Sequence, residues 1–191
     1  MVRLALALSA LGHPVTLLAA FLAVLAWVRP PERPAAVAAA LVLLGVPAVA
    51  LAVGRARGWW SDLDLPDRRE RWGFLPVALG ASLAARAVVT RLGPHAVVGT
   101  VLTLIATWLA VDWVITFWWK VSLHAGAAVG LPVFTAVWTG RPAPLAFLLL
   151  ALGVGWSRRV LGRHTTAQVV AGWLLGGLLG LGFGLVAHRL G

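Results

Sequence analysis

The chain has 191 residues, of which 61% are hydrophobic and only 12% are charged, whereas a soluble domain carries about 25% charged residues. Its 16 Lys and Arg residues against 6 Asp and Glu residues give a formal net charge of +10, and the lack of cysteine excludes disulfides, thiolate chemistry and cysteine-ligated metals. Because the arginines lie between apolar runs, we expect membrane lipids and a phosphorylated lipid substrate as partners, and no nucleic acid.

Seven apolar runs are candidates for membrane-spanning helices, because about 20 apolar residues cross the hydrocarbon core of a bilayer. The first run begins almost at Met1, but it is too long for a signal-peptide core, and no convincing small-residue cleavage site follows it. The sixth run is short. In chain order, the predicted spans cover residues 4–28, 35–53, 74–92, 96–117, 119–139, 143–156 and 166–187. The sequence predicts an all-α fold, a polytopic membrane helical bundle of six to seven transmembrane helices in a single transmembrane domain, 1–191.

Three polar segments stand at the ends of predicted spans, whereas the other connections are short turns rich in proline and arginine. The segments cover residues 54–74, 118–126 and 156–168, and they follow the second, fourth and sixth spans. Since two crossings always return a chain to its starting side of the membrane, all three segments are predicted to face the same side. We therefore expect them to assemble one polar site at one membrane surface.

The arginine-rich face that these segments form sets the predicted orientation in the membrane. The positive-inside rule places such a face in the cytoplasm. Several of its basic residues are also candidate substrate ligands, and without them the two sides carry nearly equal positive charge. We expect an integral protein of the bacterial inner (plasma) membrane with its site on the cytoplasmic side, and the sequence leaves the opposite orientation open.

The three segments contain the side chains that phosphoryl chemistry needs. Guanidinium groups clamp the non-bridging oxygens of a phosphate, while an imidazole attacks phosphorus or protonates the leaving group. A two-metal site built on the few carboxylates is a less natural alternative to this cationic cradle, so we expect neither a metal nor another cofactor. The candidate residues are Arg68, Arg71, Lys120, Ser122, His124, Ser157, Arg158, Arg163 and His164.

The third polar segment resembles a signature of the type 2 phosphatidic acid phosphatase superfamily. In that signature Ser and Arg are followed, after five residues, by His and then by Asp four positions later. Ser157, Arg158 and His164 match the first three of these positions. Gln168 stands in place of the Asp. The resemblance implies a phosphatase-like core of about residues 54–187.

The two other polar segments are similar to the first and second signatures of the same superfamily. Ser122 and His124 match two positions of its Pro-Ser-Gly-His signature. In the signature that places Lys seven residues before an Arg-Pro pair, Arg71 matches the Arg, whereas Asp64 replaces the Lys and Trp72 replaces the Pro. The order of the three segments along the chain also agrees with the superfamily.

The resemblance implies a role for each matching residue. His164 would be the nucleophile that forms a phosphohistidine, and His124 would be the acid that protonates the departing oxygen. Arg71, Arg158 and the Ser122 hydroxyl would bind the phosphate. An enzyme of this kind works without metal and dephosphorylates a membrane lipid phosphate or isoprenoid diphosphate, such as phosphatidate, phosphatidylglycerol phosphate or a polyprenyl diphosphate.

Two departures from the signatures leave a non-enzymatic alternative open. Gln168 can orient the imidazole of His164 but brings no negative charge, and a change of Asp to its amide lowers turnover about 10⁴-fold in a serine protease. Asp64 adds negative charge where an anionic substrate is expected to lie. The chain can therefore also be a catalytically inactive phosphatase-like protein, which binds lipid or serves as an assembly subunit of a membrane complex. A small transporter is a third alternative, although few charges lie within the predicted spans.

The remaining polar and glycine residues have structural interpretations beside functional ones. Asp112 lies inside the fourth span, where an ionisable group is costly, and can line the floor of the site, pair with Arg86 or be protonated. The run 62–71 is equally well interpreted as a solvated helix of alternating charge. Glycines over residues 172–184 indicate a tight helix contact, within the fold or with a second copy or another membrane protein. No site role is expected for the histidines near other span ends, His13, His95 and His188.

Overall fold

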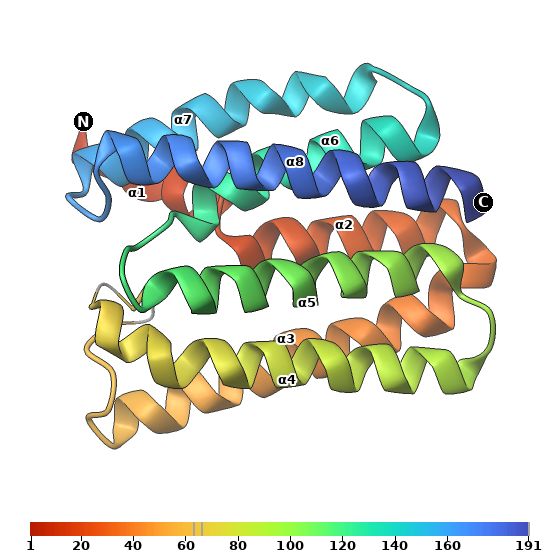
Figure 1. Ribbon diagram of the computed structural model, residues 1–191, viewed down its shortest axis with the longest axis horizontal. Coiled ribbons are helices and arrows are strands. Elements are labelled where there is room, and N and C mark those ends of the chain that lie inside the picture. The colour runs from red at the N-terminus through yellow and green to blue at the C-terminus, as the bar shows by residue number, and fades with distance from the viewer. Residues whose placement is uncertain (63, 66, 191) are drawn as a thin grey trace. The chain divides into compact units, whose positions relative to one another are not determined.

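The structure of the chain is a computed structural model that describes residues 1–62, 64, 65 and 67–190. All regular elements among these residues are helical, which confirms the predicted all-α polytopic membrane fold (Figure 1). In chain order, the elements are α1 (Val2–Leu11), α2 (Pro14–Val28), η1 (Pro30–Glu32), α3 (Arg33–Ala56), α4 (Arg68–Leu92), α5 (Ala96–Thr116), α6 (Leu123–Thr139), η2 (Ala143–Phe147), α7 (Leu148–Val160) and α8 (Thr166–Leu190).

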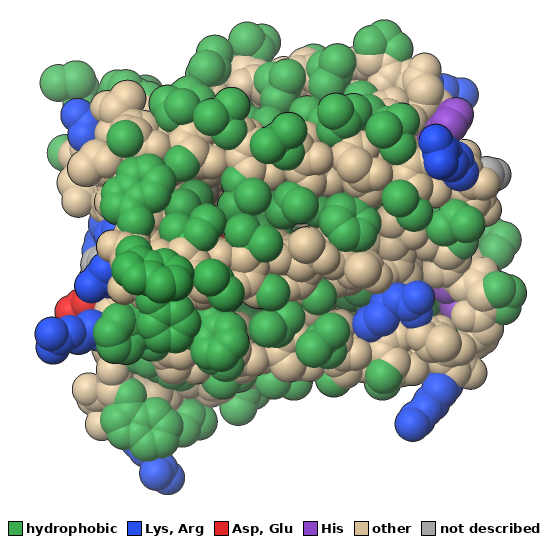
Figure 2. Space-filling model, in the orientation of Figure 1, with side chains coloured by type: hydrophobic (Ala, Val, Ile, Leu, Met, Phe, Trp, Pro, Cys, Tyr) green, Lys and Arg blue, Asp and Glu red, His purple; other side chains and the backbone are tan. Residues whose placement is uncertain are grey.

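Apolar helices of membrane-spanning length account for most of the described chain. Five helical stretches are long and apolar enough to cross a membrane, and α1 with α2 makes a sixth if this bent pair is one span. The apolar helix α6 is shorter, at 17 residues. On the face drawn in Figure 2, hydrophobic side chains cover the flanks of the helices, and Lys and Arg side chains lie toward their ends. This distribution is that of an integral membrane protein.

The described residues form two compact units. The first unit comprises Met1–Phe21 and Val121–Gly191, and the second unit comprises Leu22–Lys120. In the first unit α8 packs along α6, while α7 contacts both α1 and α6. In the second unit α4 packs against both α3 and α5. The predicted single domain over residues 1–191 and its core of about 54–187 stay predictions.

The first predicted span is not one helix but two, because the sequence "GHP" interrupts it at residues 12–14. α1 ends at Leu11, α2 begins at Pro14, and the two helices are bent by 45°. Proline lacks the N–H that the helix interior needs and is suited to the first position of a new helix. The Nδ1 atom of His13 accepts a hydrogen bond from the N–H of Val15 at 3.2 Å and caps α2. The expected unbroken first span is wrong for this reason.

The helix α4 begins earlier than the predicted third span because an aspartate caps it. The Oδ1 atom of Asp67 accepts a hydrogen bond from the N–H of Arg69 at 2.8 Å, and Glu70 adds negative charge in the first turn. Hydropathy alone misses this charged turn, and the helix begins at Arg68. Of the charged run 62–71, residues 68–71 are therefore helical, and the described residues before them lie outside the helix.

Glycines on one side of α8 allow its backbone to approach that of α6. A Cβ atom at Gly176 would overlap the carbonyl oxygen of Gly126. A Cβ atom at Gly180 would overlap the carbonyl oxygen of Gly130. The spacing of four residues places bare backbone on one helix face, which is how membrane helices pack closely. The glycine run therefore forms a contact within the fold, which is one of the predicted alternatives.

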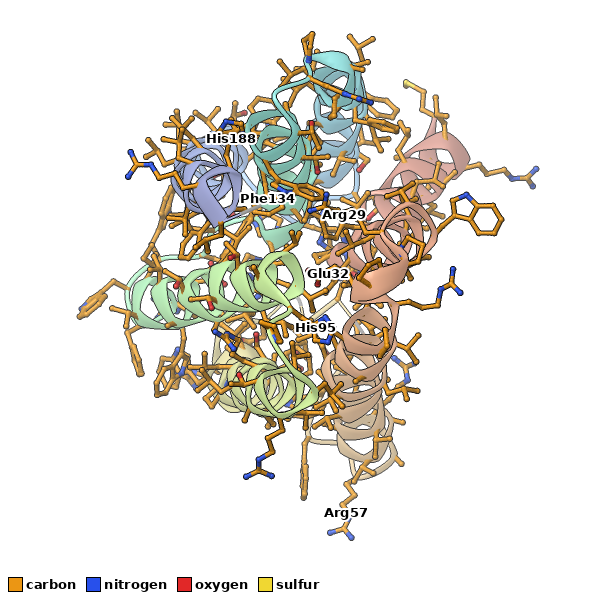
Figure 3. The ribbon with its side chains drawn as sticks, turned by 90° about the vertical axis from the view of Figure 1, so that its right-hand side faces the viewer. Arg29, Glu32, Arg57, His95, Phe134 and His188 are labelled. Atoms are coloured by element: carbon orange, nitrogen blue, oxygen red, sulfur yellow. The ribbon has the colours of Figure 1, made fainter. Side chains whose placement is uncertain are left out.

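In the second unit, a buried glutamate links η1 to the first turn of α5. The Oε2 atom of Glu32 accepts a hydrogen bond from the N–H of Val98 at 3.3 Å and lies 3.8 Å from Nδ1 of His95 (Figure 3). The first N–H groups of a helix have no partner inside the helix, so this carboxylate supplies a cap from a distant part of the chain. His95 thus contributes to a contact that stabilises the start of α5.

Candidate active site

His164 and Gln168 are joined by a hydrogen bond at the start of α8. The Nδ1 atom of His164 lies 3.1 Å from Oε1 of Gln168. The same Oε1 atom accepts from the N–H of Thr165 at 3.1 Å, and the hydroxyl oxygen of Thr165 accepts from the N–H of Gln168 at 3.3 Å. This reciprocal pair is a capping box, so Gln168 has a structural role at the third helix position besides its contact with the imidazole.

The capping box decides which nitrogen of His164 carries the proton. A main-chain N–H can only donate, so the Gln168 atom that faces both Thr165 and the imidazole is the amide oxygen. This oxygen can only accept, so Nδ1 of His164 carries the hydrogen of the bond between the two side chains. The lone pair of the neutral imidazole then lies on Nε2, which is the atom that would attack phosphorus.

Arg158 is buried at the end of α7 and organises the turn that leads to His164. Its side chain is 1% exposed, and its Nη1 atom donates to the hydroxyl oxygen of Ser9 in α1 at 2.7 Å. Its carbonyl oxygen accepts from the N–H groups of Arg163 and His164, at 3.0 and 3.2 Å. Gly162, with a φ angle of +66°, permits this reversal of the chain. The signature spacing between Arg158 and His164 is therefore the length of a helix-ending turn.

The two predicted serine ligands, Ser122 and Ser157, are both engaged by the backbone of their own helices. Ser122 caps α6, since its Oγ atom accepts a hydrogen bond from the N–H of Ala125 at 3.3 Å. Ser157 donates its hydroxyl proton to the carbonyl oxygen of Val154 at 2.7 Å. Both side chains are fully buried. The capping bond leaves the Ser122 proton for another acceptor, whereas the Ser157 proton is engaged within α7.

Close contact between the starts of α6 and α8 brings two polar segments together in the first unit. The main-chain N–H of Ser122 donates to the carbonyl oxygen of Gln168 at 3.2 Å. A Cβ atom at Gly172 would lie 2.5 Å from the carbonyl oxygen of Ser122, so no side chain fits between the two backbones. The predicted segments 118–126 and 156–168 therefore meet at the residues that resemble the second and third signatures.

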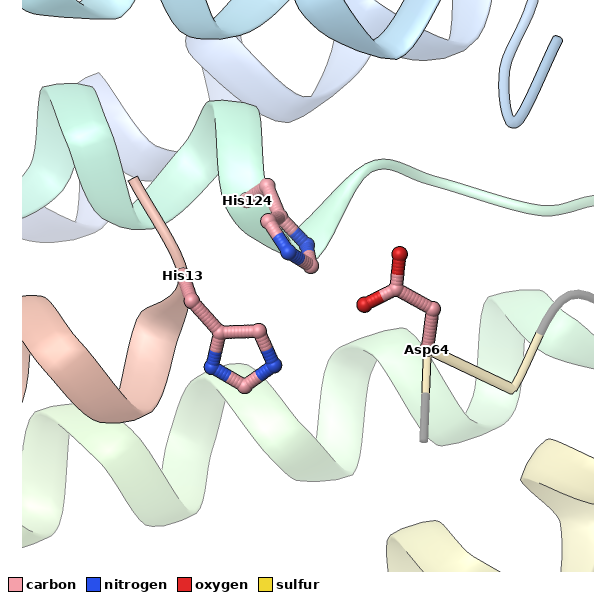
Figure 4. Close-up of side chains that lie close together, drawn as sticks. All are labelled: His13, Asp64 and His124. Carbon is pink, nitrogen blue, oxygen red and sulfur yellow. The ribbon is translucent and has the colours of Figure 1, made fainter. Parts of the chain in front are cut away.

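His124, the second residue of α6, contacts His13, for which the sequence predicted no site role. The ring centroids of the two histidines lie 4.8 Å apart, and the ring planes are at 86° (Figure 4). The side chain of His124 is 6% exposed. The local signal for His13 is a polar residue between a glycine and a proline inside an apolar run, which marks the break between α1 and α2.

The second unit holds the other predicted phosphate ligands, at the start of α4 and just after the end of α5. The Nε atom of the buried Arg71 donates to the carbonyl oxygen of Leu65 at 3.1 Å. The Nη1 atom of Arg68 donates to the carbonyl oxygen of Trp118 at 2.7 Å. Lys120 is half-buried and is the last residue of this unit. These contacts hold the two arginine side chains against the main chain.

Asp112 is a fully buried carboxylate near the end of α5. Neither of its oxygens has a hydrogen-bond partner among the described residues. Among the described residues, the guanidinium of Arg71 in α4 is a charged group that attracts it. The predicted alternative of a pair with Arg86 is wrong, because Arg86 lies beside Gly99 at the other end of α5. A rise of about 1.5 Å per residue puts Asp112 roughly 20 Å farther along the helix.

The structure divides the predicted site residues between the two units. The first unit contains the two imidazoles, of His124 and His164, and the amide of Gln168 that replaces the signature carboxylate. It also contains four candidate phosphate ligands, Ser122, Ser157, Arg158 and Arg163. The second unit contains the three remaining cationic ligands, Arg68, Arg71 and Lys120. The expectation that all of these residues form one site stays a prediction.

Comparisons with protein-family models, with curated proteins and with solved structures gave no match to this chain. Membership of the type 2 phosphatidic acid phosphatase superfamily is accordingly a proposal that rests on the signature residues. The hydrogen bond between His164 and Gln168 gives two of these residues a chemical relationship that does not depend on the resemblance.

Proposed function

We propose that this chain is an integral membrane phosphatase of the bacterial inner membrane, with its site on the cytoplasmic side. Its substrate is a membrane lipid phosphate or isoprenoid diphosphate, and its intermediate is a phosphohistidine on His164. As in the superfamily that the chain resembles, no metal takes part. The observation that carries the proposal is the hydrogen bond from His164 Nδ1 to Gln168 Oε1, because it leaves the nucleophilic lone pair on Nε2.

The proposed reaction consists of two displacements at phosphorus. In the first, Nε2 of His164 forms a bond to phosphorus, the P–O bond to the lipid breaks, and protonated His124 gives its proton to the departing oxygen. In the second, the oxygen of water forms a bond to phosphorus, the bond between phosphorus and Nε2 of His164 breaks, and His124 takes a proton from that water. Inorganic phosphate then leaves. General acid and base catalysis of this kind contributes about 10²–10⁴-fold in rate. His124 thus regains in the second step the proton that it gave in the first.

Arginine side chains supply the positive charge that a transferring phosphoryl group needs. The guanidinium of Arg158 is buried, and its bond to Ser9 holds it in place. Arg163 immediately precedes His164 in the turn after α7. Charges on buried groups act more strongly than charges in water, which favours Arg158 as the principal ligand. Ser122 is the other ligand proposed within the first unit, whereas the Ser157 proton is already donated to the carbonyl oxygen of Val154.

The second candidate is a catalytically inactive phosphatase-like protein that binds a lipid headgroup or assembles with other membrane proteins, and one observation favours it. Gln168 completes the capping box of α8, so the glutamine stabilises the helix whether or not catalysis occurs. Its amide also brings no negative charge to stabilise an imidazolium at His164. The two candidates share the same cationic residues and differ only in turnover.

The experiment that tests the proposal is phosphate release by the purified protein in detergent micelles with EDTA present. The substrates are phosphatidate, phosphatidylglycerol phosphate, and farnesyl or undecaprenyl diphosphate. Release that disappears in His164→Ala supports the phosphohistidine enzyme and identifies its substrate class. Release that persists in His164→Ala excludes His164 as the nucleophile.

Two further variants separate the enzyme from the inactive alternative. Gln168→Asp restores the carboxylate of the signature. If wild type is inactive and this variant releases phosphate, the natural chain has kept the phosphate ligands and lost the catalytic step. His188→Ala is the matched control, because His188 lies at the far end of α8, with Nδ1 3.0 Å from the carbonyl oxygen of Trp138. The control should release phosphate like wild type. Release by neither wild type nor Gln168→Asp would contradict the proposal.

A further inference from the structure

The backbone on both sides of His13 is fixed by the residues next to it. A Cβ atom at Gly12 would overlap the side chain of Val154, so only glycine fits where the end of α1 packs on α7. Pro14 begins α2, and Nδ1 of His13 accepts a hydrogen bond from the N–H of Val15 at 3.2 Å. The imidazole of His13 is therefore held by the fixed backbone at this residue and by the hydrogen bond that its Nδ1 atom accepts.

The ring of His13 meets the ring of His124 edge to face. The centroids lie 4.8 Å apart and the planes are at 86°. The close-up in Figure 4 shows the two rings beside each other. Such T-shaped pairs are attractive because the positive edge of one ring faces the negative π-face of the other. A histidine on the first turn of a helix can otherwise choose among several rotamers. The contact with the fixed ring of His13 reduces the number of orientations that the His124 imidazole can take.

We propose that His13 is a positioning residue that orients the imidazole of His124 for proton transfer. The inference rests on the proposed function, in which His124 protonates the leaving group. An acid works only when its nitrogen is within hydrogen-bond reach of the oxygen that it protonates, and a displacement of about 1 Å can cost roughly 100-fold in rate. His13 lies outside the three signature segments, and its effect on the reaction passes through His124.

Substitution can separate two of the contacts that His13 makes. Its Nδ1 atom caps α2, and its ring orients His124. Asparagine is among the best helix N-caps but has no aromatic ring, so His13→Asn keeps the first contact and removes the second. Phenylalanine has an aromatic ring but no hydrogen-bond acceptor, so His13→Phe keeps the second contact and removes the first.

Steady-state phosphate release and thermal unfolding of these two variants test the proposal. We expect His13→Asn to keep the Tm of wild type and to lose about 10-fold to 100-fold in kcat, with KM within about twofold of wild type. We expect His13→Phe to have a lower Tm but a kcat within about threefold of wild type. If His13 served only to cap α2, the kcat of His13→Asn would instead be higher than that of His13→Phe. A wild-type kcat in His13→Asn overturns the proposal.

Histidine NMR gives a second readout that needs no turnover. In micelle-embedded protein with carbon-13-labelled histidine, the His124 resonance is assigned by its loss in His124→Gln. We expect this resonance to move in His13→Asn, because the neighbouring ring is lost, and to stay in place in the control His188→Asn. A His124 resonance that does not move in His13→Asn overturns the proposal. An inactive wild type would defeat the proposed function, and the NMR result would still show whether the ring of His13 contacts His124 in the protein.

Discussion

Ser122 donates its main-chain N–H to the carbonyl oxygen of Gln168 at 3.2 Å, and this bond ties the first turn of α6 to the first turn of α8. The approach is possible because Gly172 presents no side chain to the carbonyl oxygen of Ser122. His124 follows Ser122 by two residues, and His164 precedes Gln168 by four. Packing between two helix starts therefore brings both candidate catalytic histidines to one end of the first unit.

Gly172→Ala is expected to force these two helix starts apart. The added Cβ atom would lie 2.5 Å from the carbonyl oxygen of Ser122, and main chain cannot move aside as a flexible side chain can. We expect the free energy of unfolding to fall by about 1–3 kcal/mol, and phosphate release to fall with it. Reversible unfolding in detergent measures the first effect, and the release assay measures the second.

Gly182→Ala on the same helix is the matched control for Gly172→Ala. No atom lies within 4 Å of a Cβ atom at Gly182. Alanine favours a helix over glycine by up to about 1 kcal/mol, so the control should be as stable as wild type or slightly more stable. Equal stability of the two variants would contradict the close approach of the α6 and α8 backbones.

Gln168→Glu tests whether the missing negative charge limits the reaction. Glutamate has the length of glutamine, is favoured at this position of a capping box, and can accept hydrogen bonds from both Thr165 and His164. Its charge would stabilise the positive imidazole that forms at His164, so we expect kcat to rise about 10-fold to 1,000-fold. The measurement is steady-state phosphate release. If kcat is no higher than that of wild type, the missing negative charge does not limit the reaction, and the hydrogen bond from Gln168 is sufficient to orient His164.

Gln168→Leu is the complement of that variant, because it removes both hydrogen bonds while keeping a side chain of similar size. The half of the capping box that the glutamine side chain makes is lost, whereas the main-chain N–H of residue 168 still donates to Thr165, so we expect the free energy of unfolding to fall by about 1 kcal/mol. The imidazole of His164 also loses the partner that fixes its tautomer, so kcat should fall as well. Stability lost without any loss of kcat would mean that Gln168 serves the helix only, as the inactive candidate requires.

The sequence predicted those features that depend on neighbouring residues. The length and apolarity of a run are local properties, which is why hydropathy predicted the membrane helices. The spacing of four residues between His164 and Gln168 likewise predicted that the amide can accept a hydrogen bond from the imidazole, and the bond at 3.1 Å confirms it. The capping box was not predicted, although a Thr followed three residues later by Gln is its signature.

Partners from distant parts of the chain could not be predicted in this way. Ser9 accepts a hydrogen bond from Arg158 across 149 positions of sequence, and nothing near Ser9 distinguishes it from a lipid-facing serine. Glu32 likewise caps a helix 66 positions away. His13 had a local signal, the "GHP" break in an apolar run, but that signal predicts a helix end and not a histidine neighbour. Tertiary packing decides such contacts.

Glu32→Ala is expected to weaken the second unit without changing the chemistry. It removes the acceptor for the Val98 N–H and the contact with His95, so we expect the free energy of unfolding to fall by about 1–3 kcal/mol. Phosphate release per folded molecule should stay at the wild-type level, because neither partner is a candidate site residue. Glu32→Gln keeps an acceptor oxygen and should lose less stability. Loss of kcat at unchanged stability would contradict this assignment.

The hydroxyl of Ser9 is expected to affect substrate binding more than that of Ser157. Ser9→Ala removes the acceptor that holds the buried guanidinium of Arg158, which costs about 1–3 kcal/mol of stability. Without this bond the guanidinium would be less well aligned for phosphate, so we expect KM to rise about 10-fold.

Ser157→Ala is the matched control, because it also removes one buried hydroxyl from a helix. The Ser157 proton is already donated to the carbonyl oxygen of Val154, so we expect KM and kcat to stay within about twofold of wild type. Steady-state kinetics with the substrate identified in the release assay gives both constants. If Ser157→Ala raises KM and Ser9→Ala does not, the phosphate ligand is the serine of the signature, and the bond from Arg158 to Ser9 only joins α1 to α7.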